Sequence, residues 1–264
     1  MKKTIRYILL TVCVCVFCYS AYNLIQIYLN YKKIDDDYGE IAKTYTEEKV
    51  EEKESYLQIN WDELLQRNKD VKAWIQIPNT NVNYPVLQGE TNDTYIHSDI
   101  DHNELSAGSI FIASENEDPF NDFNTVIYGH NMKNGSMFNN IKSYTDQSFA
   151  DEHPYVYIYL PDGTVSQYKV VVGHIISEIS SLYGTNNDMD KSSFIQEMVK
   201  TSSIKVDFDQ SQVQSVITLS TCTSAGSESG KRNVVHAILQ RKGIDPVKKN
   251  GKLEKSSFFV VNCK

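Results

Sequence analysis

The sequence predicts a mainly β protein whose strands form a closed barrel or a sandwich. Short runs rich in β-branched and aromatic residues recur along the chain, and turn residues separate them. Two of these runs, 155–160 and 165–176, flank Pro161-Asp162-Gly163 and are typical of a β-hairpin. The 264 residues include 17 tyrosines but only 6 prolines, which favours an ordered β-rich body over disorder.

The chain begins with a basic segment that leads into a long apolar run. Residues 1–6 contain three basic side chains, and residues 7–31 are almost wholly apolar. The run approaches the ~20 residues that a bilayer-spanning helix needs, and the basic side chains before it favour a cytoplasmic N-terminus. We expect a cytoplasmic tail at 1–6, a single-pass transmembrane anchor at 7–31 and a catalytic domain outside the cell membrane. A cleaved signal peptide is the alternative.

A charged segment separates the apolar run from the expected domain. Residues 32–56 predict a solvated stalk or helix, with the most helical pattern over Glu47–Glu54. Residues 57–264 form the expected domain. Its first element is a short helix over 61–67, which Asn60 can cap and whose apolar residues recur at helical spacing.

The rest of the domain is predicted as strands with one helical insertion. Pro85 predicts that its strand lies at an edge or contains a bulge. Residues 190–200 predict a helix with Phe194, Ile195 and Met198 on one side, placed before the last two strands. Besides the hairpin, the predicted strands are Ala73–Ile77, Val82–Leu87, Ser109–Ala113, Thr125–His130, Val213–Leu219 and Asn233–Leu239.

Charge and metal-ligand patterns argue against several functional classes. The net charge is −8, so the basic footprint of a nucleic-acid-binding protein is missing. A segment that starts at Asp99 partly imitates a calcium loop, but Glu104 and Ile110 occupy positions that require Gly and Glu. Cysteine and histidine do not recur at zinc-site spacing. We therefore expect no metal, no cofactor and no nucleic-acid partner.

Cysteine usage singles out one thiol. Three of the five cysteines lie in the apolar N-terminal run, which leaves Cys222 and Cys263 for the folded part. These two could pair in principle, and a buried small hydrophobe is the ordinary role of an isolated cysteine. Cys222, however, ends one predicted strand, and Arg232 stands at the start of the next. The two side chains can face one cleft, which suits a nucleophile beside a fixed positive charge.

A nucleophilic thiol needs a proton acceptor, and the six histidines differ in setting. His97, His102 and His153 lie in polar segments that are typical of the surface. His174 and His236 lie inside strands, where a core role is usual. His130 ends an apolar strand, follows a glycine and opens a polar loop, the position at which catalytic groups are commonly carried.

The motifs around these residues resemble those of the sortases, the cysteine transpeptidases of Gram-positive cell surfaces. The resemblance rests on Thr218-Leu219-Ser220-Thr221-Cys222, on Arg232 and on Tyr128-Gly129-His130-Asn131. It extends over Asn83–Gly89, Gly108–Phe111 and Met137-Phe138. The helix before the first strand and the helical insertion are similar to class B. The resemblance implies an eight-stranded sortase β-barrel and a membrane anchor.

The resemblance also implies roles for residues. Cys222 would be the nucleophile, His130 the acid–base and Arg232 the fixed donor for substrate and oxyanion. Substrate contacts are implied for Ser220, Thr221, Asn92, Ile96, Leu182 and Tyr183. Thr223 departs from the acidic residue of some class B relatives, so a substrate contact there is not expected.

The implied reaction cleaves a sorting signal similar to N-P-x-T-[GN] after its Thr and passes the surface protein to a peptidoglycan cross-bridge amine of the lipid II type. Alternatives are a pilin-polymerising sortase, a cysteine hydrolase that uses water, and a membrane-tethered binding module in which Cys222 is structural.

Overall fold

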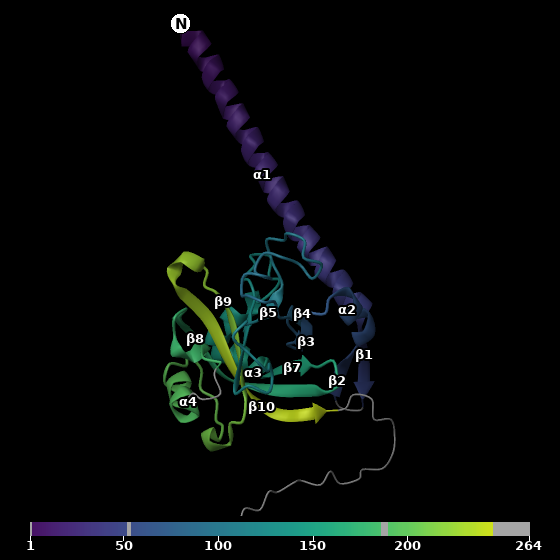
Figure 1. Cartoon of the computed structure of the whole chain (residues 1–264). Helices are drawn as coiled ribbons and strands as arrows, with labels where there is room; N and C mark the ends of the chain where they lie inside the picture. The colour runs from purple at the N-terminus through teal and green to yellow at the C-terminus, as the bar shows by residue number, and fades with distance from the viewer. Residues whose placement is uncertain (1, 52–53, 186–189, 245–264) are drawn as a thin grey trace, which may run out of the picture.

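The computed structural model describes residues 2–51, 54–185 and 190–244. Its body is a closed eight-stranded barrel with the strand order β10-β8-β7-β3-β4-β5-β6-β9 (Figure 1). The β4–β5 and β6–β9 pairs are parallel and the others antiparallel. This confirms the predicted eight-stranded barrel. The barrel strands are β3 Val71–Gln76, β4 Asn83–Leu87, β5 Ile110–Ile112, β6 Asn124–Tyr128, β7 Tyr155–Tyr159, β8 Val165–Ser177, β9 Val216–Cys222 and β10 Lys231–Ile244.

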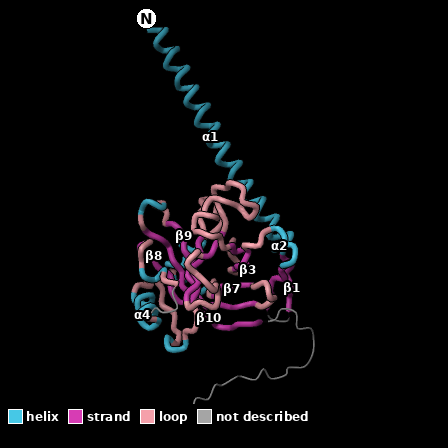
Figure 2. The backbone as a smooth tube through the Cα atoms, in the orientation of Figure 1, coloured by secondary structure: helices cyan, strands magenta, loops and turns pink. Residues whose placement is uncertain are grey.

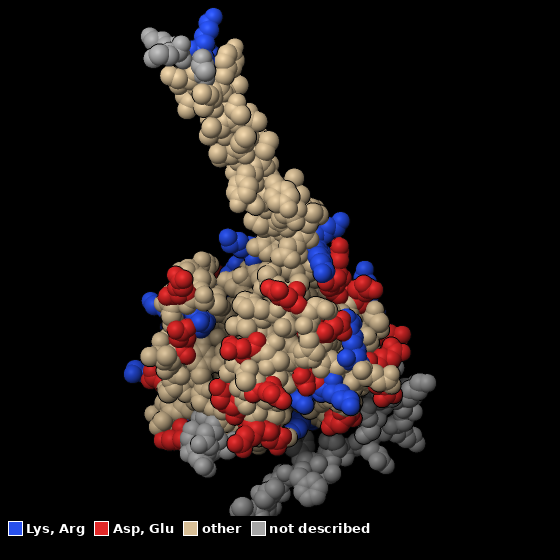
Figure 3. All heavy atoms as spheres, turned by 45° about the horizontal axis from the view of Figure 1, so that its top comes forward, with Lys and Arg blue, Asp and Glu red and all other residues tan. Residues whose placement is uncertain are grey.

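One helix, α1 (Lys2–Tyr45), runs from the N-terminus to the barrel (Figures 1 and 2). Its first part projects away from the barrel. This part contains no Lys, Arg, Asp or Glu between Arg6 and Lys32 and is the tan column in Figure 3. Among the described residues, it is the one helix long and apolar enough to cross a bilayer, and such a helix fits a membrane anchor or a signal sequence.

The second part of α1 is helical, one of the two forms predicted for this charged segment, but it packs on the barrel and is not solvated on all sides. Ile34, Tyr38 and Ile41 are buried in the main core. The Tyr38 hydroxyl also donates to the carbonyl oxygen of Gly108 at 2.6 Å. Acidic residues fill the other faces of these turns, so net charge hides an apolar stripe at helical spacing.

The helix predicted over Glu47–Glu54 is wrong. The chain forms a two-stranded sheet instead, from β1 (Thr46–Glu51) and β2 (Glu54–Ile59). Tyr56, Leu57 and Ile59 of β2 are buried in the barrel core. The favourable helix propensity of Glu and Lys is a weak preference, and the burial of this apolar strand overrides it.

Two smaller predictions around the first strands have different outcomes. Helix α2 (Trp61–Arg67) is confirmed, since the Asn60 side chain accepts a hydrogen bond from the Glu63 amide at 3.4 Å. Of the two positions inferred from Pro85, the edge is wrong, because β4 lies between β3 and β5 in a closed barrel. The β3–β4 pairing does shift register, between Val71 and Ala73 of β3, close to Pro85. Pro85 is tolerated there because β5 pairs with Val86 and Leu87 only.

The insertion before β9 covers the outer wall of the barrel. Helix α4 (Lys191–Lys200) begins after its cap Asp190 and buries Phe194, Ile195 and Met198, which confirms the predicted face. These side chains form a second core with residues of β8, β9 and β10. The remaining short helices are η1 Asn139–Thr145, α3 Gln147–Glu152, η2 Ser181–Tyr183, η3 Gln210–Gln212 and η4 Ser227–Ser229.

Candidate active site

Strand pairing places Cys222 directly opposite Arg232. Cys222 is the last residue of β9, and Arg232, the second residue of β10, is its cross-strand partner. The loop between them turns through left-handed Gly226 and Gly230, with φ of 88° and 62°. The carbonyl of Cys222 accepts from the side-chain amides of Asn131 at 2.9 Å and Asn233 at 3.1 Å. These contacts fix the strand end that carries the thiol.

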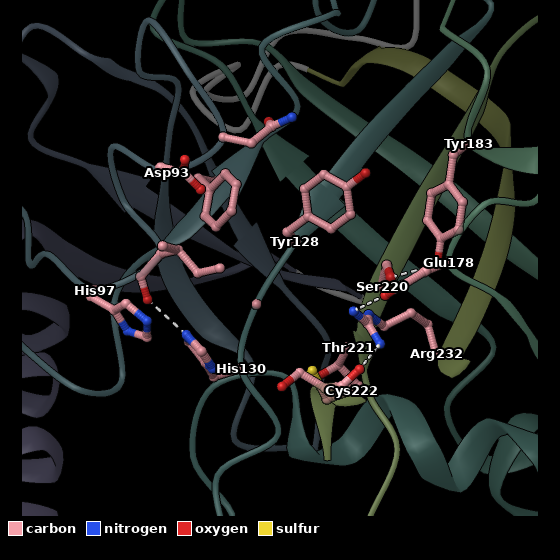
Figure 4. Close-up of a pocket in the computed structure, with 15 residues that line it drawn as sticks. Asp93, His97, Tyr128, His130, Glu178, Tyr183, Ser220, Thr221, Cys222 and Arg232 are labelled. Carbon is pink, nitrogen blue, oxygen red and sulfur yellow. Dashed lines mark hydrogen bonds and ion pairs between the residues drawn. The ribbon is translucent and has the colours of Figure 1, made fainter. Parts of the chain in front are cut away.

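Cys222, His130 and Arg232 line the same cavity of about 430 Å³ (Figure 4). Tyr128, Tyr183 and Ser220 form part of its wall, as do Asn92 and Ile96. Cys222 is half-buried and is a free thiol. The possible partner Cys263 lies outside the described residues. Among those residues, no group of three His, Cys, Asp or Glu side chains could hold a metal ion.

His130 lies just beyond β6, after Gly129. A Cβ on Gly129 would clash with Ile110 Cδ1 and would lie 2.8 Å from the Phe138 ring. Glycine therefore lets the backbone just before His130 pack closely against these two side chains. The His130 Nε2 atom lies 2.7 Å from the Ile96 carbonyl oxygen. Because that oxygen can only accept, Nε2 carries the proton and Nδ1 presents a lone pair in the neutral ring.

The surroundings of His130 favour the neutral ring. Burial lowers its pKa below the ordinary value, the bond to Ile96 opposes this effect, and the nearby His97 lowers the pKa further. The His97 ring stacks on His130 with centroids 5.6 Å apart and an interplanar angle of 24°. His97 is exposed, as its polar segment predicts, but it also lines the cavity, which sequence reasoning missed.

Arg232 forms an ion pair with Glu178, a residue that sequence reasoning did not identify. Its Nη2 contacts Glu178 Oε2, and its Nη1 donates to the carbonyls of Ser227 at 3.3 Å and Lys231 at 3.0 Å. Glu178 follows β8 and also lines the cavity. The guanidinium is thereby held beside the thiol strand. Thr223, for which no substrate contact is expected, contacts Ser229 of the same loop, with their hydroxyl oxygens 3.1 Å apart.

Ser220 and Tyr183 meet in the cavity wall. Their hydroxyl oxygens are 2.8 Å apart, and the Tyr183 ring stacks on Tyr128 with centroids 6.1 Å apart (Figure 4). Burial raises the pKa of Tyr183 to about 12, so its hydroxyl keeps its proton at neutral pH. Ser220 and Cys222 point to the same side of β9, because alternate residues of a strand share a face.

The other predicted substrate residues differ in position. Asn92 lines the cavity, where its amide donates to the carboxylate of Glu115 at 2.9 and 3.1 Å. Ile96 also lines it. Thr221 lines it too, but its side chain is buried and its hydroxyl oxygen has no hydrogen-bond partner among the described residues. Leu182 is not in the lining, because its side chain is buried in the second core against α4.

Comparisons with known proteins agree with this geometry. A family model of the Sortase domain matches residues 75–240. Sortase B of Staphylococcus aureus (strain NCTC 8325 / PS 47) is 30% identical over 250 residues, which cover 90% of this chain and 97% of that protein.

Solved structures give the same result. A Staphylococcus aureus sortase B–substrate complex matches with a TM-score of 0.62 and 32% identity, over 69% of this chain and 84% of that chain. A sortase B complexed with triglycine also matches with a TM-score of 0.62 and 32% identity, over 69% and 85% of the two chains. With its barrel, its motifs and these relatives, the chain belongs to the sortase family of cysteine transpeptidases, in its sortase B group.

Proposed function

We propose that this enzyme cleaves a C-terminal sorting signal of the N-P-x-T-[GN] type after its Thr and joins the acyl group to an amine. The observation that carries the proposal is that Cys222, His130 and Arg232 line one cavity of a sortase barrel. A relative solved with a substrate supports a peptide partner, and one solved with triglycine supports a glycine amine as acceptor.

In the first half-reaction, the Cys222 sulfur attacks the carbonyl carbon of the substrate Thr. Its thiol proton passes to Nδ1 of His130, because Nε2 already donates to Ile96. The scissile C–N bond then breaks as His130 returns that proton to the leaving amine. The products are a thioacyl enzyme and a free C-terminal fragment.

In the second half-reaction, the acceptor amine attacks the thioester carbon. Neutral His130 takes a proton from the amine, and the C–S bond breaks as the thiolate of Cys222 leaves and receives that proton from His130. The new amide joins the surface protein to its acceptor, for which a peptidoglycan cross-bridge amine of the lipid II type fits the triglycine complex of the relative.

Arg232 serves as a fixed donor. A guanidinium stays protonated and offers several donors in one plane, so it suits a substrate backbone and the oxyanion that forms at the attacked carbonyl. Its position opposite Cys222 supports this role. In the groove, Ser220, Asn92 and Ile96 would contact the signal beside Tyr183, whereas Leu182 would support the wall by packing.

The N-terminal part of α1 is proposed to be an uncleaved anchor over 7–31, with 1–6 in the cytoplasm and the barrel outside the cell. The supporting observation is that α1 passes from its exposed apolar part into packed contact with the barrel. The amide of Asn30, next to the last residue of the apolar run, donates to the Ser106 hydroxyl at 2.8 Å.

Product analysis tests the reaction. The full-length enzyme is incubated with fluorescent peptides of the N-P-x-T-[GN] type, with and without triglycine, and the products are identified by mass spectrometry. We expect an amide product with triglycine and slow hydrolysis without it. If both samples contain only the hydrolysed peptide, the enzyme is a hydrolase. If none of the peptides is cleaved, the proposal is contradicted.

Thr221 offers a prediction about the buried hydroxyl next to the nucleophile. Burying a hydroxyl without a partner costs about 1–3 kcal/mol of folding free energy, so removing the Thr221 hydroxyl should not destabilise the fold. Thr221→Val is expected to keep the melting temperature and to lower kcat/KM about tenfold, because the substrate loses its contact. Thr221→Ser is the control and should retain most activity. A Val variant with wild-type kinetics would show that the hydroxyl contacts no substrate.

The stacked pair His97–His130 predicts a shift in pH dependence. The acid limb of the kcat/KM profile follows the titration of His130, whose pKa lies below its ordinary value. His97→Asn removes a neighbouring positive charge and part of the cover over His130, and both changes raise the pKa of His130. The acid limb is therefore expected to move to higher pH. His102→Asn, at an exposed histidine outside the cavity, should leave the limb in place; an unmoved or lowered limb in His97→Asn would contradict the prediction.

A further inference from the structure

A continuous chain of buried hydrogen bonds links helix α4 to the wall of the active-site cavity. His174 of β8 and His236 of β10 meet at 3.1 Å between their Nε2 atoms. His174 Nδ1 lies 2.9 Å from the hydroxyl of Thr201, the C-cap of α4. His236 Nδ1 lies 2.9 Å from the hydroxyl of Thr218 on β9, and that hydroxyl lies 2.6 Å from Asn124 Oδ1 on β6.

The far end of this chain is the segment that carries Tyr183. The side-chain amide of Asn124 donates to the carbonyls of Leu182 at 3.4 Å and Gly184 at 2.9 Å. These carbonyls flank Tyr183, whose hydroxyl contacts Ser220 in the cavity. The short helix η2 is thus held by Asn124 from the side of the barrel.

The acceptor at the Asn124 end sets the direction of the chain. The amide oxygen of Asn124 can only accept, so the Thr218 hydroxyl donates to it and must accept from His236 Nδ1–H. His236 Nε2 then bears a lone pair, which requires Nε2–H on His174. The remaining nitrogen, His174 Nδ1, is then an acceptor beside the Thr201 hydroxyl, whose single proton it shares with the Glu197 carbonyl oxygen 2.9 Å away. The other three ring nitrogens are each paired when both histidines are neutral and hold these opposite tautomers.

Burial makes this order costly to disturb. Asn124, Thr218 and His236 are 0% exposed, and His174 is 1% exposed. Burial lowers the pKa of His174 to about 4 and that of His236 well below its ordinary value, so both rings are neutral near pH 7. A member that loses its partner leaves an unsatisfied polar group in the interior.

We propose that the chain from Thr201 through Asn124 is a positioning device for Tyr183, and that it sets the affinity for the sorting peptide without tuning the reactivity of Cys222. The inference rests on the proposed transpeptidase function. Asn124, Thr218, His174 and His236 are therefore positioning residues, because none of them lines the cavity and each acts through η2.

Thr218→Val tests the proposal in the full-length enzyme in detergent micelles. Val keeps the shape of Thr but removes the hydroxyl, which leaves His236 Nδ1–H and Asn124 Oδ1 unpartnered. We expect KM for the peptide to rise about tenfold with kcat within about twofold of wild type. Thr218→Ser keeps the hydroxyl and should restore KM. Thr164→Val is the matched control, since Thr164 donates to Asp162 in the distant β7–β8 turn.

Two further measurements separate the outcomes. Alkylation of Cys222 by a small thiol reagent should keep its wild-type rate in Thr218→Val. Unchanged KM would overturn the proposal, and so would parallel losses of kcat and alkylation rate, because the damage would then reach the nucleophile. If the wild-type enzyme itself cleaves no peptide, the proposed function fails and the inference fails with it.

Nitrogen NMR of the wild-type enzyme with labelled histidine tests the chain even if Thr218→Val does not fold. Protonated and lone-pair nitrogens have well-separated signals, so the tautomers can be assigned near pH 7. We expect Nδ1–H on His236 and Nε2–H on His174. The reverse tautomers, or a charged ring, would contradict the directed chain.

Discussion

Cys222→Ala is expected to abolish peptide cleavage, with a loss in kcat/KM of at least about 10⁴-fold. The side chain supplies the atom that forms the thioacyl bond, and no other described thiol lines the cavity. The residual rate has no covalent route, since His130 and Arg232 can only assist attack by water. The measurement is single-turnover cleavage of a fluorescent peptide, together with the mass of the intact enzyme during turnover.

The mass measurement makes this prediction specific. The wild-type enzyme should gain the mass of the acyl fragment, and Cys222→Ala should not. Cys18→Ala is the matched control, because Cys18 is an exposed thiol of α1 far from the cavity. It should retain both cleavage and the adduct. Cleavage by Cys222→Ala, or an adduct that persists in it, would remove Cys222 from the mechanism.

The fold could be predicted where local pattern and burial agree. The α4 face is an example, because the helical spacing of Phe194, Ile195 and Met198 is also the set of side chains that the structure buries. The β1–β2 sheet could not be predicted, since its residues favour a helix and their strand conformation depends on burial against the barrel. Barrel closure was accessible only through resemblance, because local alternation also fits a sandwich.

The candidate site shows the same division. Cys222 and Arg232 flank one short loop, so adjacent antiparallel strands bring them together. Glu178, the residue after β8, contacts Arg232 from 54 residues away in sequence, and no local signal marks it. His97 looks like any surface histidine until the fold brings its loop over His130. Contacts of this kind depend on the register of distant segments, which single-sequence patterns do not contain.

Arg232→Ala is expected to lower kcat/KM about 10²- to 10³-fold, the usual cost of a lost oxyanion donor. The effect should fall mainly on kcat, because the developing negative charge exists only in the transition state. Arg232→Lys should recover a minor part of the loss, since an ammonium keeps the charge but lacks the planar set of donors. The measurement is steady-state kinetics of the peptide with triglycine, with thermal unfolding as the control for folding.

Glu178→Gln separates the donor from its support. The Arg232 side chain is 19% exposed and that of Glu178 45%, so their ion pair is screened in part by water and its loss should cost less than the loss of the guanidinium. We expect kcat/KM to fall about fivefold in Glu178→Gln, and the double variant with Arg232→Ala to be no worse than Arg232→Ala alone. Additive losses would mean that Glu178 acts independently of Arg232.

Full activity in Arg232→Lys would mean that charge alone, without the planar donor geometry, suffices at this position.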